Sequence, residues 1–294
     1  MPVDEDKYPV ESDRRRFVKG VVGGATLAGI TTAGSAAVNS ATAPSGQGGG
    51  TTTFRAVENT DGPAPRGMPQ IPIELEPIDG EDDYYIKGVW PEVSTETQQG
   101  REVKVAKQDI AGVTYSSEWF QYCGVQTYTG VYPDAQEENS DLTNYFRYTE
   151  SSQYEWQSSE VSGGDRMKLS DFEDYETWEN GVGTPGIGKP ATGTWRSEGL
   201  EPAETMPVEI IRSKRIEQMA KENPDSWLAA STDQGVMAHL NKCTHFCCVP
   251  GFKKEGSAKF AAADAIYCQC HQSVYDPFNI VEKSFVALPR PSKE

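Results

Sequence analysis

The spacing of charged and uncharged positions separates a short N-terminal part from a long polar remainder. Residues 20–43 form a run of 24 positions without a charged side chain, whereas mean hydropathy over the whole chain is −0.60. A helix rising about 1.5 Å per residue would make this run about 36 Å long, enough to cross a bilayer core of roughly 30 Å. The pattern predicts one N-terminal membrane-anchor helix and excludes a polytopic membrane protein.

Short motifs on either side of this run indicate export. The stretch RRRFVK at positions 14–19 resembles the twin-arginine export signal, which carries folded proteins and so implies a cofactor inserted before export. The stretch ATA at positions 41–43 would suit cleavage, but Pro44 follows it and favours retention as a single-pass anchor. The basic residues before the span would stay inside, which places the rest of the chain on the extracytoplasmic face.

Beyond the anchor, the pattern predicts extended structure. Residues 44–53 (PSGQGGGTTT) are expected to be a flexible linker. Residues 54–92 are rich in proline and alternate in places, so we expect extended chain rather than helices. Residues 101–200 are dense in Tyr, Trp, Gly, Ser and Glu without a helical period, which favours β-structure with long loops and an aromatic core.

Two local patterns stand out near the C-terminus. Residues 210–222 have the one credible helical period of this region, and the helix should stop at Asn223-Pro224. Residues 227–231 and 236–240 are apolar runs split by a short glycine turn, which predicts a β-hairpin. The chain is thus expected to be mainly β.

The charge is concentrated in the middle of the chain. The formal net charge is −17, and residues 54–200 hold 27 Asp and Glu against 11 Lys and Arg, whereas residues 201–294 hold 12 against 11. This balance excludes nucleic acid as a partner, because phosphate binding needs a basic surface. Two interpretations stay open: an ordinary solvated acidic surface, or an organism living in high salt, such as a halophilic archaeon.

These observations divide the chain into five segments. They are a twin-arginine region (1–19), a signal or transmembrane anchor (20–43), a flexible linker (44–53), an acidic β-rich extension (54–200) and a head domain (201–294).

The residues that bear chemistry gather in two short boxes of the head. Box 1 is residues 241–252 (NKCTHFCCVPGF), box 2 is residues 267–278 (YCQCHQSVYDPF), and together they hold five of the six cysteines and two of the three histidines. Thiolate and imidazole are ligands of soft and borderline metals. A zinc site is one interpretation, but each box carries an additional cysteine for which a simple zinc site has no use. His239 lies outside both boxes and is expected to be structural.

The boxes resemble those of the Rieske iron–sulfur protein of cytochrome bc-type complexes. The family pattern is C-T-H-L-G-C followed by C-P-C-H-G-S, and this chain has CTHFCC and CQCHQS, with the likeness covering roughly residues 225–292. The resemblance implies an antiparallel β head with two cluster-binding loops and one [2Fe–2S] cluster. Cys243 and Cys268 would hold one iron, and His245 and His271 the other. Two imidazoles in place of two thiolates make such a centre less negative and raise its potential.

The resemblance also implies roles for residues around the cluster. Cys248 and Cys270 would form a disulfide between the two loops. Ser273 and Tyr275 would donate hydroxyl hydrogen bonds to a cluster sulfide and a ligand sulfur, which favours the high-potential branch. Pro289, in the stretch LPRP, would shield the other side of the cluster.

The chain departs from the family pattern at three positions. Cys247 and Gln272 stand where the family has glycine, and Gln269 where it has proline. Because glycine allows tight backbone packing, a side chain at position 247 predicts that this loop has relaxed or adopted a different turn. Residues 100–200 are expected to be a large insertion or extension.

The function that the resemblance implies is electron transfer without an independent active site. The chain would serve a quinol:cytochrome c (or copper protein) oxidoreductase of the respiratory chain. Quinol, bound to a cytochrome b-type membrane subunit, would face His271 or His245, and the acceptor would be a c-type cytochrome or a blue copper protein. A relay subunit of another exported enzyme, of the nitrate reductase or arsenite oxidase type, is the alternative. A Rieske oxygenase is excluded, because its mononuclear iron needs two further histidines and only His239 is left.

Cys123 is the one cysteine outside the boxes. An even number of cysteines in an oxidising compartment leads us to expect a second disulfide between Cys123 and Cys247, with a buried free thiol as the alternative.

Overall fold

A computed structural model describes residues 50–98, 101–135 and 144–287. Within these ranges the protein is mainly β, and all strand pairings are antiparallel, which confirms the predicted fold class at this level. Among the described residues, no helix is both long and apolar enough to span a membrane. The predicted export signal, the anchor, the linker as far as residue 49, and Pro289 lie outside the described residues.

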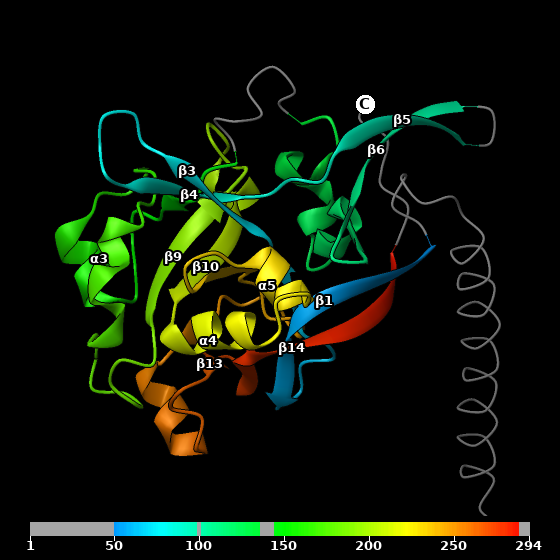
Figure 1. Ribbon diagram of the computed structural model, residues 1–294. Helices are drawn as coiled ribbons and strands as arrows, with labels where there is room; N and C mark the ends of the chain where they lie inside the picture. Colours follow the sequence, from blue (N-terminus) through cyan, green and yellow to red (C-terminus); the bar gives the residue numbers. More distant parts are fainter. Residues whose placement is uncertain (1–49, 99–100, 136–143, 288–294) are drawn as a thin grey trace, which may run out of the picture.

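A nine-stranded sheet forms the centre of the fold (Figure 1). Its order is β12 (Gly251–Phe252), β13 (Ile266–Cys268), β14 (Ser273–Ala287), β1 (Gly50–Asp61), β2 (Met68–Ile71), β11 (Val236–Leu240), β10 (Met206–Arg212), β9 (Lys189–Trp195) and β8 (Arg147–Tyr148). The expected boundary at residue 200 falls between β9 and β10, which are neighbouring strands. Residues from both sides of that boundary therefore build one sheet.

Two smaller sheets and several short helices surround this sheet. The sheets are β3 (Ile73–Pro77) with β4 (Tyr84–Gly88), and β5 (Val93–Gln98) with β6 (Arg101–Ile110) and β7 (Val113–Ser116). The α-helices are α3 (Glu155–Glu160), α4 (Lys214–Glu222) and α5 (Trp227–Ser231). The 3-10 helices are η2 (Ser117–Phe120), η3 (Val125–Thr127), η4 (Thr129–Val131), η6 (Ser170–Glu176), η7 (Pro202–Glu204) and η8 (Glu255–Phe260).

The linker prediction was wrong for residues 50–53. These residues begin β1 and pair with Ala287, Val286, Phe285 and Ser284 of β14. Threonine is β-branched and suits an extended strand, and Thr52 is buried against the rest of the protein. The chain therefore enters the sheet at Gly50.

The predicted helix at residues 210–222 was right only for its second half. Residues 206–212 form the central strand β10, bonded to β9 on one side and β11 on the other. A strand buried on both faces has a nearly continuous apolar run, which periodicity cannot distinguish from a buried helix. Ser213 then begins α4, since its hydroxyl accepts a hydrogen bond from the Arg215 N–H.

The predicted hairpin was wrong in its first arm. Residues 227–231 form α5, capped by the Ser226 hydroxyl, which accepts a hydrogen bond from the Ala229 N–H. Residues 236–240 are a strand as predicted, but β11 pairs with β10 and β2. The short turn therefore joins a helix to a strand.

The aromatic residues of the middle region are core residues, as predicted. Trp119, Phe120 and Trp195 are completely buried, and Trp119 packs against Trp227 with ring centroids 5.2 Å apart. Because these rings come from both sides of residue 200, the acidic region and the head share one hydrophobic core.

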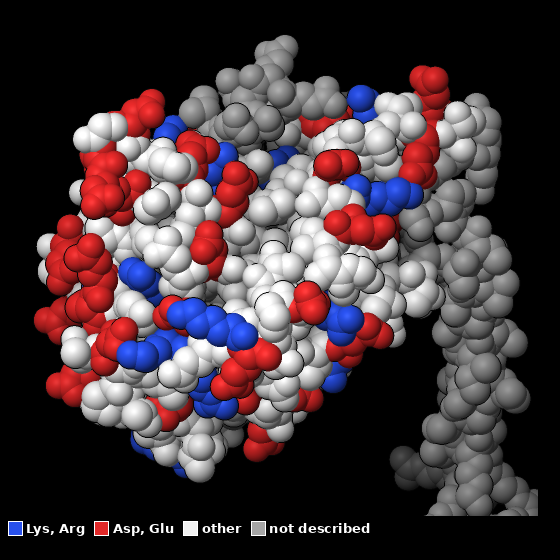
Figure 2. Space-filling view, viewed as in Figure 1, with Lys and Arg blue, Asp and Glu red and all other residues white. Residues whose placement is uncertain are grey.

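The acidic residues lie mainly outside this core. Figure 2 shows Asp and Glu side chains gathered over α3 and the loops beside it. Glu155 and Glu160 of α3 and Glu173 and Glu179 nearby are exposed. The charge of the middle region is thus carried on its outer surface, where water solvates it.

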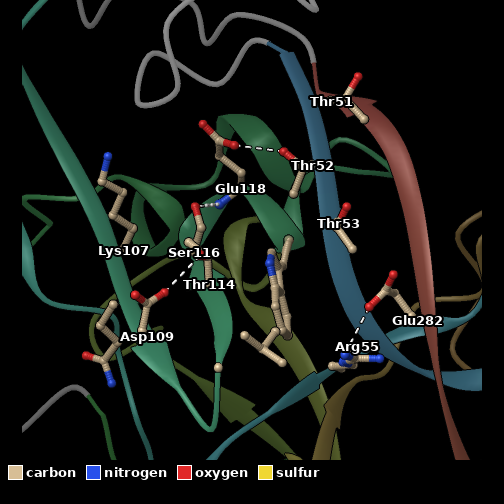
Figure 3. Close-up of a pocket in the computed structure, with 14 residues that line it drawn as sticks. Thr51, Thr52, Thr53, Arg55, Lys107, Asp109, Thr114, Ser116, Glu118 and Glu282 are labelled. Atoms are coloured by element: carbon tan, nitrogen blue, oxygen red, sulfur yellow. Dashed lines mark hydrogen bonds and ion pairs between the residues drawn. The ribbon is translucent and has the colours of Figure 1, made fainter.

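A polar cleft of about 580 Å³ separates β1 from the β6–β7 hairpin and η2. In Figure 3 the Thr52 hydroxyl reaches across to Glu118, and Arg55 pairs with Glu282 on the neighbouring strand. The Thr52–Glu118 hydrogen bond, 2.7 Å long and buried, helps to hold the hairpin against the main sheet.

Replacing Ser213 tests the boundary between β10 and α4. Its buried hydroxyl caps α4 and donates a 2.5 Å hydrogen bond to the Ile187 carbonyl. We expect Ser213→Ala to lower the free energy of unfolding by about 1–2 kcal/mol, measured by urea denaturation. Ser159→Ala, at an exposed position of α3, should stay within about 0.5 kcal/mol of the wild type. Equal stability of the two variants would contradict this assignment.

Candidate metal centre

The pairing of two short strands brings the boxes together. Box 1 leads from β11 into β12, and box 2 leads from β13 into β14. Because β12 pairs with β13 in antiparallel fashion, with Gly251 opposite Tyr267, the chain before β12 and the chain after β13 lie at the same end of the pair. Two loops far apart in sequence therefore meet at one edge of the sheet.

The two thiols predicted as ligands lie in the interior of this edge. Cys243 and Cys268 are each 1% exposed and are not in disulfides. The neighbouring Cys268 thiol lowers the pKa of Cys243, with a smaller contribution from the Tyr275 hydroxyl, while Cys243 raises the pKa of Cys268. The thiolate is the form of cysteine that binds metals.

The two predicted imidazole ligands lie beside each other nearer the surface. His245 is partly buried and His271 is exposed, and their ring centroids are 4.7 Å apart at an interplanar angle of 85°. His245 Nδ1 is buried and has no hydrogen-bond partner among the described residues. The candidate ligands therefore form two pairs, the buried thiols of Cys243 and Cys268 and the outer imidazoles of His245 and His271.

The two loops have the same backbone turn. The Cys247 N–H donates to the Cys243 carbonyl at 3.0 Å, and the Gln272 N–H donates to the Cys268 carbonyl at 2.9 Å. Both donors have left-handed backbone conformations, with φ of +63° at Cys247 and +65° at Gln272. These are the two positions where glycine was expected, and a side chain there costs about 1–2 kcal/mol. Both side chains are thus accommodated in the left-handed conformation that glycine adopts most easily.

Two disulfides brace the loops. Cys248 pairs with Cys270 across the boxes, with Cα atoms 6.7 Å apart. Cys123 pairs with Cys247, with Cα atoms 5.3 Å apart, as expected from the even number of cysteines. The sulfurs of Cys248, Cys268 and Cys270 lie within 4.8 Å of one another, but two of them are bonded to each other and offer no thiolate.

The middle region also supports box 1 through polar contacts. The Tyr122 hydroxyl donates to the Lys242 carbonyl at 2.9 Å, and the Lys242 ammonium donates to the Tyr128 hydroxyl at 2.8 Å and the Cys123 carbonyl at 3.1 Å. We had assigned these tyrosines to the core alone. The adjacency of Tyr122 to Cys123 is the one sequence signal that could have revealed this support.

The loop between β1 and β2 closes the other side. The Thr244 hydroxyl donates a 2.5 Å hydrogen bond to the Arg66 carbonyl. Gly62 has φ of +80°, and a Cβ there would lie 2.5 Å from the Gln272 carbonyl oxygen. Only glycine permits this approach to box 2.

The remaining predicted residues lie against the thiols. The Tyr275 hydroxyl donates to Cys243 Sγ at 3.2 Å and accepts from the Thr244 N–H at 3.2 Å. Ser273 is opposite Cys268 in the β13–β14 pairing and is fully buried, but its hydroxyl has no partner among the described residues. Two thiols, two imidazoles, an unpartnered ring nitrogen and an unpartnered hydroxyl fit a group that binds nitrogen and sulfur and accepts a hydrogen bond.

An exposed aromatic side chain lies beside the imidazoles. Phe246 is 66% exposed, and its ring centroid lies 4.4 Å from that of His245 and 5.0 Å from that of His271.

Comparison with protein-family models, with curated proteins and with solved structures finds no match for this chain. The chemistry of the centre must therefore be argued from its own residues.

Paired substitutions test the strain in the two turns. Cys123→Ser/Cys247→Ser removes a disulfide and should lower the free energy of unfolding by about 2–5 kcal/mol. Cys123→Ser/Cys247→Gly should lose about 1 kcal/mol less, because glycine adopts the left-handed conformation freely. Urea denaturation without reductant measures both.

Gln272→Gly is the matched control, since this position has the same conformation and no disulfide. It should stabilise the protein by about 1 kcal/mol. Equal stabilities of the serine and glycine variants at position 247 would show that the left-handed turn carries no cost.

Proposed function

We propose that the two boxes bind a Rieske-type [2Fe–2S] group and that the protein is a membrane-anchored electron-transfer subunit of a cytochrome bc-type complex. The observation that carries this proposal is the separation of the donor set into a buried thiol pair and an outer imidazole pair. Cys243 and Cys268 would hold one iron, and His245 and His271 the other. The bound group supplies a site that gains and loses one electron.

The unpartnered groups favour an iron–sulfur group over a single zinc ion. Zinc would use the four ligands and offer the buried Ser273 hydroxyl only ligand sulfurs as acceptors, whereas a cluster also offers inorganic sulfide. An inorganic sulfide offers that hydroxyl a hydrogen-bond acceptor, and the Tyr275 hydroxyl already points its hydrogen at a ligand sulfur. Such hydrogen bonds stabilise the more negative, reduced state and raise the potential.

The exposed imidazole supports quinol as the electron donor. His271 is exposed and borders the apolar Phe246, so its ring can hydrogen-bond a quinol hydroxyl held in an apolar pocket of a cytochrome b-type partner. The imidazole would hold the proton that leaves the quinol hydroxyl, while the electron passes to the bound group. A c-type cytochrome or a blue copper protein would then take the electron at the same exposed edge.

Spectroscopy of the full-length protein in isolated membranes tests the proposal. After reduction by dithionite, we expect the EPR signal of a reduced [2Fe–2S] centre, with iron and acid-labile sulfide in equal amounts. Cys268→Ser should abolish the signal. Cys123→Ser/Cys247→Gly should keep it, since those cysteines are not proposed ligands. A silent sample with stoichiometric zinc would reject the proposal.

The same signal distinguishes the two partner classes. A shift on adding a quinol-site inhibitor is expected if quinol contacts the imidazoles. An iron–sulfur signal that no such inhibitor shifts would instead favour a relay subunit of another exported redox enzyme, of the nitrate reductase or arsenite oxidase type.

Tyr275→Phe should lower the midpoint potential of the centre. The lost hydroxyl donates to Cys243 Sγ, and a hydrogen bond about 1 kcal/mol stronger in the reduced state corresponds to about 40 mV for one electron. Redox-titrated EPR measures the shift. Tyr267→Phe is the control, because the buried Tyr267 ring stacks on Phe260. The midpoint potential of the centre in this variant should stay at the wild-type value. Equal shifts in both variants would argue against a specific bond.

A further inference from the structure

A row of buried polar side chains crosses the main sheet below box 1. Gln70, His239, Glu209 and Thr192 are successive cross-strand partners on β2, β11, β10 and β9. The first three are 0% exposed and Thr192 is 8% exposed. Cross-strand partners project from the same face of a sheet, so these side chains are neighbours in the core. A carboxyl and an imidazole are thus buried side by side, outside the metal centre.

Glu209 uses its two oxygens differently. Oε1 accepts a 2.5 Å hydrogen bond from the Tyr154 hydroxyl and a 2.9 Å hydrogen bond from the Phe252 N–H. Oε2 lies 3.6 Å from His239 Nε2 and has no hydrogen-bond partner. The carboxyl therefore binds the last residue of box 1 through one oxygen and faces His239 with the other.

Asn241, the first residue of box 1, lies beside the imidazole. Its Nδ2 donates to the Pro250 carbonyl at 3.1 Å, which leaves Oδ1 without a partner beside the imidazole. Gln70 Oε1 accepts from Trp227 Nε1 at 2.7 Å, which leaves Gln70 Nε2 without one. Of nine unpartnered buried side-chain atoms among the described residues, five belong to Gln70, Glu209, His239 and Asn241. Both ends of box 1 are thus tied to one polar cluster.

One proton decides the charge of the carboxyl and of the imidazole. A neutral imidazole has one N–H and one bare nitrogen. If Nδ1 carries its hydrogen toward Asn241 Oδ1, the bare Nε2 faces Glu209 Oε2, and a protonated carboxyl leaves both groups neutral. The alternative, a carboxylate facing an imidazolium, would bury two charges in the core 3.6 Å apart, beyond hydrogen-bond distance.

Burial favours the neutral form of both Glu209 and His239. It raises the pKa of the Glu209 carboxyl to about 7 and lowers the pKa of the His239 imidazole to about 3. The other titratable groups facing Glu209 are Tyr154, from the chain before α3, and Lys254, from the chain before η8, whose charge acts the opposite way.

We propose that Glu209 and His239 form a neutral buried pair that holds one proton on Glu209 Oε2, facing the bare Nε2 of His239, and that this pair supports the loop of box 1. The proposal does not rest on the identity of the metal, because both residues lie outside the four ligands. It assigns a positioning role, since the pair acts on Cys243 and His245 through the loop that carries them.

The proton held by this pair determines how folding stability depends on pH. The raised pKa of Glu209 contributes stability that is complete below about 4.5 and is lost as the pH rises toward 7. The depressed pKa of His239 contributes stability that is complete above about 6.5 and is lost as the pH falls toward 3. Between these ordinary values the two slopes cancel, because the folded and the unfolded pair each hold one proton.

Infrared difference spectra of the full-length protein locate the proton. Between about pH 4.5 and 6.5 we expect the C=O stretching band of a protonated carboxylic acid in the wild type and its loss in Glu209→Gln. Glu222→Gln, at an exposed position, should keep the band. If Glu209→Gln removes no such band, the pair is an ion pair and the proposal is overturned.

Single and double variants test whether Glu209 and His239 hold one proton between them. In the same pH window, the folding equilibrium constant of His239→Gln should fall about tenfold per pH unit as the pH rises, and that of Glu209→Gln should rise about tenfold. The wild type and the double variant should be nearly flat. Parallel slopes in the two single variants would overturn the proposal.

Nitrogen NMR of the wild type keeps the test open if a variant does not fold. His239 should be a neutral ring protonated at Nδ1, and an imidazolium in this window would overturn the pair. A stoichiometric metal ion lost on Glu209→Gln, with the box ligands still occupied, would overturn it as well.

Discussion

The burial of both Cys243 and Cys268 is the constraint on which the site depends. Two thiols from different loops can both lie in the interior only if the loops are held edge to edge. The β12–β13 pairing sets where the loops begin, the matched left-handed turns curve each one around its thiol, and Cys248–Cys270 ties them together. These backbone and covalent constraints limit the loop entropy and add to the hydrophobic cluster that holds Cys243 and Cys268.

The acidic middle region belongs to this arrangement. It supplies β8 and β9 to the main sheet and aromatic rings to the common core, and it reaches the site through Cys123, Tyr122 and Tyr128. Its carboxylates face outward, most visibly around α3, so high charge and a shared core are compatible (Figure 2). The middle region therefore packs against box 1 and is covalently linked to it.

Seven of the nine buried side-chain atoms without partners among the described residues fall into two groups. His245 Nδ1 and Ser273 Oγ lie at the boxes, where a bound group would satisfy them. The other five belong to the cluster around Glu209 and His239, where the place of one proton decides which groups are charged. The first group lies at the candidate metal centre, and the second lies beside the loop of box 1.

The sequence by itself determined the features that depend on local spacing or on counting. The candidate ligands could be named because cysteine and histidine are rare, clustered and spaced as in a known family pattern. That resemblance gave roles to four cysteines, and the even total left Cys123 and Cys247 as the remaining pair. Tertiary structure decided the features that depend on which strand lies beside which. Residues 206–212 became a strand, residues 227–231 a helix and Gly50–Thr53 part of the sheet because of partners distant in sequence. The meeting of Glu209 with His239 arises the same way, from the register of β10 on β11, which no local periodicity encodes.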